Sequence, residues 1–191
     1  MATYEYASIR HYYLQWLWHA GLRLGGAHAL DLKDVHLDDL YLEIRRRPDD
    51  GTTLKNGEDG ERLVNISQKT ALIIEDYIEN SRRDTEDDYG RRPLITSRYG
   101  RRSKTNLRDN IYKLSRPCVY ANECPHAFRR GSITFYLRED TPKHLVSDRR
   151  VVNQDTLDKH YDTRSDEERM RQRRDYLPFG DDGGDEPNYR E

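Results

Sequence analysis

The sequence predicts an α+β fold, a mainly helical domain that contains one small antiparallel β-sheet. In two short segments, residues 40–44 and 63–66, apolar side chains alternate with polar ones, which is typical of half-buried strands. Over much of the remaining chain, apolar residues recur at helical spacing between residues that commonly begin or end helices. A length of 191 residues suits one domain with a substantial core.

The first predicted elements surround an arginine and a lysine. From about residue 4 to residue 20, apolar side chains recur with a helical period and form an aromatic face. Gly21 suits the left-handed stop of that helix, so Arg23 follows a helix end, and a short second helix is expected over residues 24–30. The two strands come next, and the loop between them, residues 48–60, is dense in turn formers and contains Lys55.

The second half of the chain is predicted to be helical. Ser67 is a candidate N-cap for the first of these helices, and the polar segment 81–92 that follows is expected to be mobile. Further helices are predicted over residues 105–114, 125–137 and 141–148, and from residue 153 through Tyr161. Ser165 and Glu168 fit a capping box for a last helix that ends near residue 176.

The charged residues are biased in type and in position. The chain has 26 Arg but 7 Lys, and 22 Asp but 13 Glu, a pattern that indicates a salt-adapted cytoplasm. Acidic surfaces of such proteins depress the net charge, so the formal value of −2 does not exclude nucleic-acid binding. Residues 91–138 hold 12 Lys or Arg and 2 acids, with aromatic residues interleaved, which favours contact with phosphates; a solvated basic face is the alternative.

Other classes of protein and site find little support. No apolar stretch is long enough to span a membrane and no signal peptide begins the chain, so a cytoplasmic protein without membrane contact is expected. Two cysteines are too few for a disulfide framework. Cys118, Cys124 and His126 offer three zinc ligands, but the paired spacing and a fourth ligand are missing, so neither a metal nor a cofactor is expected.

Four features carry possible chemistry: Arg23, Lys55, the His126-x-x-Arg129 spacing and Tyr161. His126 and Arg129 lie one helical turn apart, which suits two contacts to one phosphate. Each feature has an ordinary alternative, namely a helix-terminal arginine, a solvated loop lysine, a chance spacing and a partly buried tyrosine.

Their order resembles the tyrosine recombinase (phage integrase) family. Residues 19–35 resemble its box one, residues 125–134 its box two, and the 32-residue interval from Arg129 to Tyr161 is similar as well. Residues 146–161 resemble integrases of halophilic archaea, and the match spans about residues 8–175. The resemblance implies the DNA breaking-rejoining enzyme fold and site-specific DNA recombination or integration, the activity of a mobile element.

The resemblance also implies a role for each residue. Tyr161 would attack a DNA phosphorus and form a 3′-phosphotyrosine while the 5′-hydroxyl leaves. Arg23 and Arg129 would bind the non-bridging oxygens, His126 would take the tyrosine proton or donate a hydrogen bond, and Lys55 would protonate the leaving oxygen. No metal ion or cofactor takes part.

Two positions depart from the family pattern. Val152 stands nine residues before Tyr161, where the family has a His or Trp, and Arg149, Arg150 and Asn153 are alternative replacements. Gly26 stands where box one usually has an acid.

We expect residues 1–176 to form the catalytic domain, without the N-terminal core-binding domain, and residues 177–191 to form an acidic disordered tail. The expected partner is double-stranded DNA, on which a homotetramer assembles through the last helix; without DNA a monomer is expected. The alternatives are a type IB topoisomerase, a non-catalytic DNA-binding remnant or regulator of an integrase, and a structural or RNA-associated domain.

Overall fold

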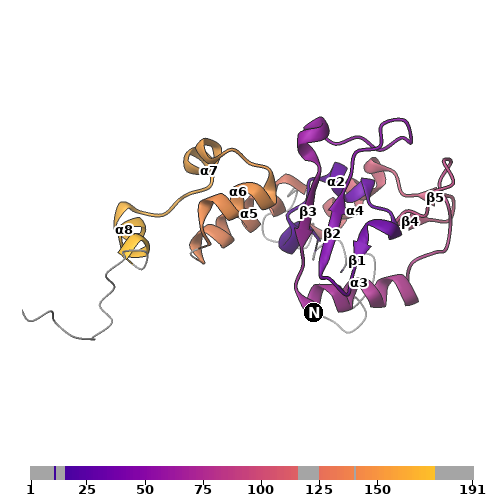
Figure 1. Cartoon of the computed structure of the whole chain (residues 1–191), viewed down its shortest axis with the longest axis horizontal. Coiled ribbons are helices and arrows are strands. Elements are labelled where there is room, and N and C mark those ends of the chain that lie inside the picture. Colours follow the sequence, from indigo (N-terminus) through magenta and orange to yellow (C-terminus); the bar gives the residue numbers. More distant parts are fainter. Residues whose placement is uncertain (1–10, 12–15, 116–124, 140, 175–191) are drawn as a thin grey trace, which may run out of the picture.

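We describe residues 11, 16–115, 125–139 and 141–174 of a computed structural model of the chain (Figure 1). Its helices are η2 (Trp16–Ala20), α2 (Leu24–Ala29), η3 (Leu32–Asp34), η4 (Gly57–Gly60), α3 (Gln68–Asn80), α4 (Lys104–Ser115), α5 (Pro125–Arg138), α6 (Lys143–Arg150), α7 (Gln154–His160) and α8 (Asp166–Arg174). Its strands are β1 (Val35–His36), β2 (Tyr41–Ile44), β3 (Arg62–Asn65), β4 (Thr96–Ser97) and β5 (Gly100–Arg101). None of the described helices is long and apolar enough to cross a lipid bilayer.

The expected antiparallel sheet is present. β2 pairs with β3 in a register that places Tyr41 opposite Asn65 and Ile44 opposite Arg62. The alternation predicted from the sequence is visible as burial, because Leu42 and Ile44 face the core while their neighbours are partly exposed. The sequence did not reveal β1, which extends this sheet, or the separate β4–β5 hairpin within the basic segment. Each of these strands has two residues, too few to show a period.

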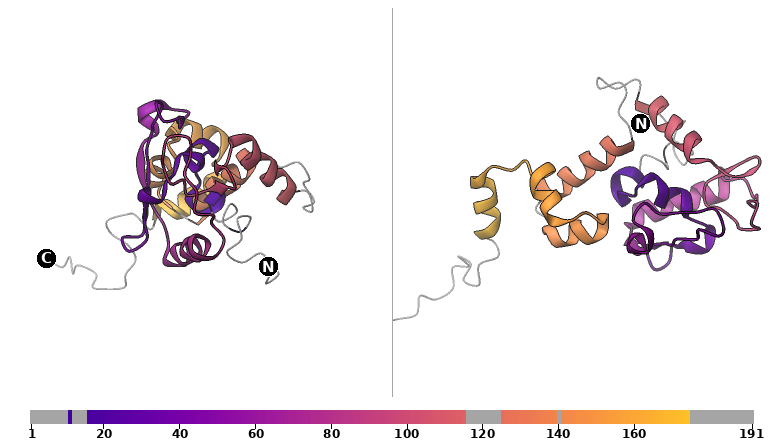
Figure 2. Two further views of the ribbon diagram at one scale, coloured as in Figure 1. Left: turned by 90° about the vertical axis from the view of Figure 1, so that its right-hand side faces the viewer. Right: turned by 90° about the horizontal axis from the view of Figure 1, so that it is seen from above.

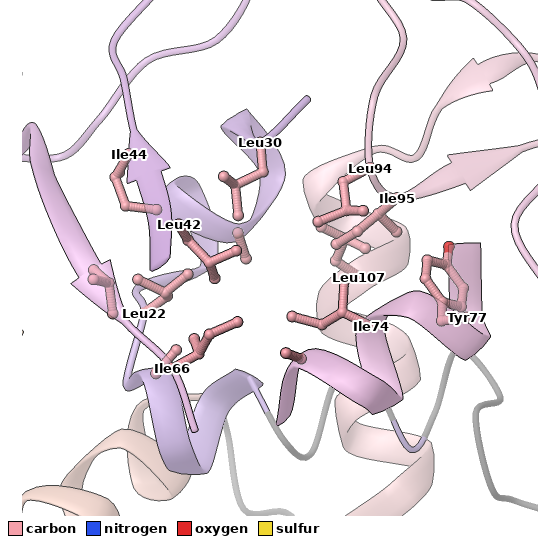
Figure 3. Close-up of a cluster of buried hydrophobic side chains, with 14 residues drawn as sticks. Leu22, Leu30, Leu42, Ile44, Ile66, Ile74, Tyr77, Leu94, Ile95 and Leu107 are labelled. Atoms are coloured by element: carbon pink, nitrogen blue, oxygen red, sulfur yellow. The ribbon is translucent and has the colours of Figure 1, made fainter. Parts of the chain in front are cut away.

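The described part of the chain has two hydrophobic clusters rather than one. The larger cluster joins the three-stranded sheet to α2, α3 and α4 (Figure 3). The smaller one consists of Ile133, Leu137, Val146, Val152 and Leu157, from α5, α6 and α7. In Figure 1 the two clusters correspond to a larger body on the right and a smaller helical body on the left, with α8 beyond it, and Figure 2 shows the same separation from above.

The N-termini of α3 and α8 confirm the predicted caps. Ser67 Oγ accepts a hydrogen bond from the Thr70 amide at 3.2 Å, as an N-cap should. Ser165 Oγ accepts from the Glu168 amide at 3.1 Å, and the Glu168 carboxylate accepts from the Ser165 amide at 2.7 Å, which completes the capping box. One expectation changes slightly: α7 ends at His160, so Tyr161 follows the helix instead of lying in it.

The segment expected to be mobile, residues 81–92, is held by buried ion pairs. Asp31, Asp34 and Asp87 lie among Arg47, Arg91 and Arg101. Arg47 donates to both oxygens of Asp34, at 2.8 and 2.5 Å, and Arg101 bonds both Asp31 and Asp87. The side chains of these three arginines are only between 9% and 16% exposed, and each of them forms an ion pair with a carboxylate. Each buried cation is therefore compensated by an acid of the same chain. We call this group the paired cluster.

Two expectations lie mostly outside the described residues. The helix expected from residue 4 is described only over its last turn, η2, which is π-helical. The tail, residues 177–191, is not described.

Candidate active site

Four of the five predicted site residues line one cavity of about 330 Å³: Arg23, Lys55, His126 and Arg129. They come from three separate parts of the chain, the start of α2, the β2–β3 loop and the first turns of α5. Arg108 and Tyr112 on α4 complete its polar lining. Neither residue was predicted from the sequence, because nothing in their spacing relates them to the other residues. The cavity thus combines three arginines, a lysine, an imidazole and a phenol.

Arg129 is fixed from both sides. Its side chain is buried, and its guanidinium donates to the backbone carbonyl oxygens of Gly21 and Arg150. Burial, followed by the charges of Arg23, Arg150 and Arg62, lowers the pKa of Arg129 to about 9. At neutral pH the group remains a cation, and one that has few neutralising neighbours.

Arg23 reaches the same region from a different element. It precedes α2 in an extended conformation, directly after the turn in which Gly21 adopts a φ of 55°. Its Nη2 donates to the Val151 carbonyl oxygen at 3.0 Å, next to the carbonyl that Arg129 binds. Burial also lowers the pKa of Arg23. The two arginines are therefore oriented by two consecutive carbonyl groups.

His126 lies one turn before Arg129, on the outer side of α5. The pKa of His126 is lowered, first by partial desolvation and then by the positive charges of Arg129, Lys55, Arg130 and Arg23. The imidazole is therefore neutral at pH 7, and it is able to accept a proton or to donate one hydrogen bond.

Tyr161 is not one of the residues that line this cavity. Its side chain is half-buried and packs against the smaller hydrophobic cluster. The charge interaction with the Tyr161 phenol raises the pKa of both Arg23 and Arg129, against the effect of burial. The phenol is therefore within electrostatic range of both guanidinium groups. Four of the five predicted residues therefore line one cavity, and Tyr161 lies near enough to two of them to influence their charge.

The residue after Tyr161 anchors this part of the chain. Asp162 is buried and binds Arg164, at 2.7 and 2.9 Å, and Lys143 at 2.9 Å. These hydrogen bonds hold the pKa of the Asp162 carboxyl far below its ordinary value, although burial opposes them. Because Lys143 belongs to α6, the ion pairs fix the end of α7 against the neighbouring helix.

The position of the missing family His or Trp is apolar here. Val152 is buried in the smaller hydrophobic cluster. Of the three alternative replacements, Asn153 caps α7 and Arg149 donates to Asn65 and to the His19 carbonyl. Arg150 alone contacts Arg129, and it does so through its backbone. None of these three side chains therefore reproduces the missing group, and the two carbonyl groups of the turn after α6 accept from Arg129 and Arg23. Gly26, at the place of the box-one acid, is buried and contributes no charge.

The zinc alternative is not tested, because Cys118 and Cys124 lie outside the described residues. Those described residues contain no group of three His, Cys, Asp or Glu able to hold a metal ion.

Solved structures with the same architecture identify the fold. The structure of XerA recombinase superposes with a TM-score of 0.66 and 20% sequence identity, over 89% of this chain and 59% of that one. The chain has the fold of a recombinase catalytic domain. The Tn1549 transposon integrase, solved in complex with circular intermediate DNA, matches with a TM-score of 0.66 and 14% identity, over 87% of this chain and 59% of the integrase. Its complex with transposon right-end DNA gives 0.63 at the same identity.

The chain spans about six tenths of the length of the recombinase structures that it matches. No protein-family model and no curated protein sequence matches it. The recombinase fold is thus established by the arrangement of the elements and not by sequence identity.

Proposed function

We propose that the chain is the catalytic domain of a tyrosine-type DNA recombinase, which cleaves and rejoins DNA strands through a 3′-phosphotyrosine intermediate. The observation that carries the proposal is the gathering of Arg23, Lys55, His126 and Arg129 around one cavity, with the Tyr161 phenol within electrostatic range of both arginines. The recombinase fold and the DNA complexes of the Tn1549 integrase add support.

In the proposed reaction the two arginines bind the scissile phosphate. A guanidinium group is planar and permanently charged, so it matches the geometry of two phosphate oxygens. Arg23 and Arg129 each use at least one N–H on a backbone carbonyl, which fixes the direction of the group before DNA arrives. Such preorganised donors stabilise the negative charge that develops on the non-bridging oxygens in the transition state.

Bond formation and cleavage then follow in line. The Tyr161 oxygen forms a bond to phosphorus, and the bond from phosphorus to the 5′ oxygen breaks. His126, neutral at pH 7, accepts the phenol proton or hydrogen-bonds the phosphate, and Lys55 protonates the leaving 5′ oxygen. Attack by the 5′-hydroxyl of another strand reverses these steps and exchanges the strands. No metal ion enters the proposed mechanism.

Covalent trapping tests the proposal directly. The chain is incubated with a nicked DNA duplex, in which the released fragment diffuses away, and denaturing electrophoresis reveals a protein-DNA band. Tyr161→Phe should abolish the band. Tyr99→Phe is the matched control, because Tyr99 is 77% exposed in the turn between β4 and β5. A band that persists in Tyr161→Phe would show that another residue is the nucleophile.

A second candidate function is a non-catalytic DNA-binding module, such as a remnant or regulator of an integrase. Buried Val152, in place of the family His or Trp, favours it, because one ligand of the phosphate pocket is then missing. This candidate predicts salt-dependent DNA binding without any covalent band, and DNA binding that is unchanged in Tyr161→Phe.

The finer features of the proposal concern assembly and environment. We propose a homotetramer on DNA in which α8, which stands apart from both bodies in Figures 1 and 2, packs onto a neighbouring protomer. We also propose that the chain works in a salt-adapted cytoplasm, as do the integrases of halophilic archaea. Relaxation of supercoiled DNA by the monomer would instead indicate a type IB topoisomerase.

A further inference from the structure

A second cavity, of about 660 Å³, lies between β3 and α6. Arg62, Arg149 and Arg150 contribute positive charge to its lining. Leu63 and Leu145, also in the lining, are 61% and 50% exposed. Asp148 is the one acid in the lining, and it is exposed. The cavity therefore carries a net positive charge.

The hydrogen bonds of Arg62 and Arg149 go to neutral acceptors. Arg62 donates to the carbonyl oxygens of Arg149, at 3.1 Å, and Gly60, at 2.8 Å. Arg149 donates to the His19 carbonyl at 3.0 Å and to the Asn65 side chain. Burial lowers the pKa of Arg62 to about 10, and the charges of Arg23 and Arg149 add to this effect. Neutral acceptors orient these cations but do not compensate their charge.

Arg150 is the most deeply buried of these three arginines. Its side chain is fully buried, with the guanidinium 4.9 Å above the Tyr136 ring and Nη2 bonded to Ser132 Oγ at 2.7 Å. Its Nε and Nη1 have no hydrogen-bond partner within the described part of the chain. Burial lowers the pKa of Arg150 to about 9. A buried cation with two unpaired N–H groups costs free energy, and its uncompensated charge adds to the positive potential of the cavity.

The paired cluster shows how the same chain treats its other buried arginines. Arg47, Arg91 and Arg101 all lie against carboxylates. Within the described ranges, no ion pair involves Arg62, Arg149 or Arg150. Because the fold compensates one arginine group with its own acids and leaves the other uncompensated, the second group is suited to an anion from outside the chain.

We propose that the cavity between β3 and α6 is a second anion site, which binds a phosphate group through Arg62 and Arg149, next to the buried positive charge of Arg150. Guanidinium groups favour phosphate because they present parallel N–H donors to two oxygens. The phosphate comes either from the backbone of bound DNA or from a free phosphate ion. This site is separate from the Arg23–Arg129 cavity, and the proposal does not depend on Tyr161 chemistry.

Titration calorimetry with inorganic phosphate, at constant ionic strength and without DNA, tests the site. We expect two phosphates per chain, one in each cavity. Leu145→Glu places a negative charge in the lining of the second cavity and should weaken one of the two sites about fivefold or more, whereas Leu145→Lys should strengthen it. Leu72→Glu is the matched control, because Leu72 is similarly exposed at 49% but lies on α3, outside the lining.

Lys55→Glu places a negative charge in the lining of the Arg23–Arg129 cavity. This substitution should weaken only the phosphate that binds in that cavity. Adding a DNA duplex then identifies the source. If DNA supplies the phosphate, the duplex removes the heat that is sensitive to Leu145; if a free ion does, that heat persists. A single bound phosphate that neither Leu145 variant affects would overturn the proposal. Failure of covalent trapping would leave this result unchanged, so the two proposals fail independently.

Discussion

The guanidinium of Arg129 donates a hydrogen bond to the backbone carbonyl oxygen of Arg150, and Arg23 binds the next carbonyl along the chain, that of Val151. The turn that follows α6 thus orients both arginines of the candidate site. The turn occupies the region where the recombinase family carries a His or Trp. Here the backbone, and not a side chain, provides the polar contacts at this point of the fold.

Substitutions of Arg23 and of Arg129 should have similar effects on cleavage but different effects on the free energy of unfolding. Either Arg23→Gln or Arg129→Gln should reduce covalent cleavage about a hundredfold or more, because each removes a charged donor from the proposed transition state. Arg129→Gln should also lower the free energy of unfolding by about 2 kcal/mol or more, since two buried carbonyl groups lose their partner.

Cleavage of the nicked duplex and urea unfolding measure the two effects of these arginine substitutions. Arg23→Gln should affect cleavage far more than stability, because Arg23 is half-buried and donates to the backbone carbonyl of Val151 alone among the described carbonyl groups. Equal losses of stability in both variants would contradict this difference.

Val151 carries a conformation that suits glycine. Its φ of 49° and ψ of 60° are left-handed, which is unfavourable for a β-branched residue. Val151→Gly should therefore stabilise the folded chain by about 1 kcal/mol and raise the melting temperature by about 2–4 °C. Thermal unfolding checks this, and Val152→Gly, which removes a buried side chain, should have the opposite effect.

Gly21 should tolerate no side chain. A Cβ atom there would overlap the guanidinium of fully buried Arg150, and the φ of 55° adds strain. Gly21→Ala should lower the free energy of unfolding by about 2 kcal/mol or more. If the overlap is the cause, the same substitution in an Arg150→Ala background should cost clearly less. An identical cost in both backgrounds would assign the effect to the backbone alone.

His28 should make stability depend on pH. Burial, followed by the charges of Lys104, Arg101 and Arg91, lowers its pKa from 6.5 to about 4. As the pH falls from 6.5 towards 4, the unfolded chain binds a proton on His28 that the folded chain does not, so stability decreases. At pH 5 the loss is about 2 kcal/mol.

Urea unfolding of the wild type and of His28→Gln between pH 7 and pH 5 measures the His28 effect. The variant should show a shallower dependence on pH. Some dependence should remain, because burial also lowers the pKa of His19 and His126. Parallel curves would show that His28 does not titrate as proposed.

The sequence by itself determined the features that depend on local patterns. Alternation revealed β2 and β3, and helical spacing with cap residues such as Ser67 and Ser165 revealed the later helices. The order of the motifs selected Arg23, Lys55, His126 and Arg129, which the structure brings to one cavity. These signals are readable because they arise between residues close in the chain, or from an ordered set of motifs.

Only the tertiary structure decided how distant residues compensate one another. The pairing of Asp31 with Arg101, 70 positions apart, and the absence of such a partner for Arg150 in the described part of the chain leave no local trace in the sequence. The bond from Arg23 to Val151, 128 positions away, is likewise a product of packing. The physical reason is that burial sets the energetic cost of each charge, and burial depends on elements brought together by folding.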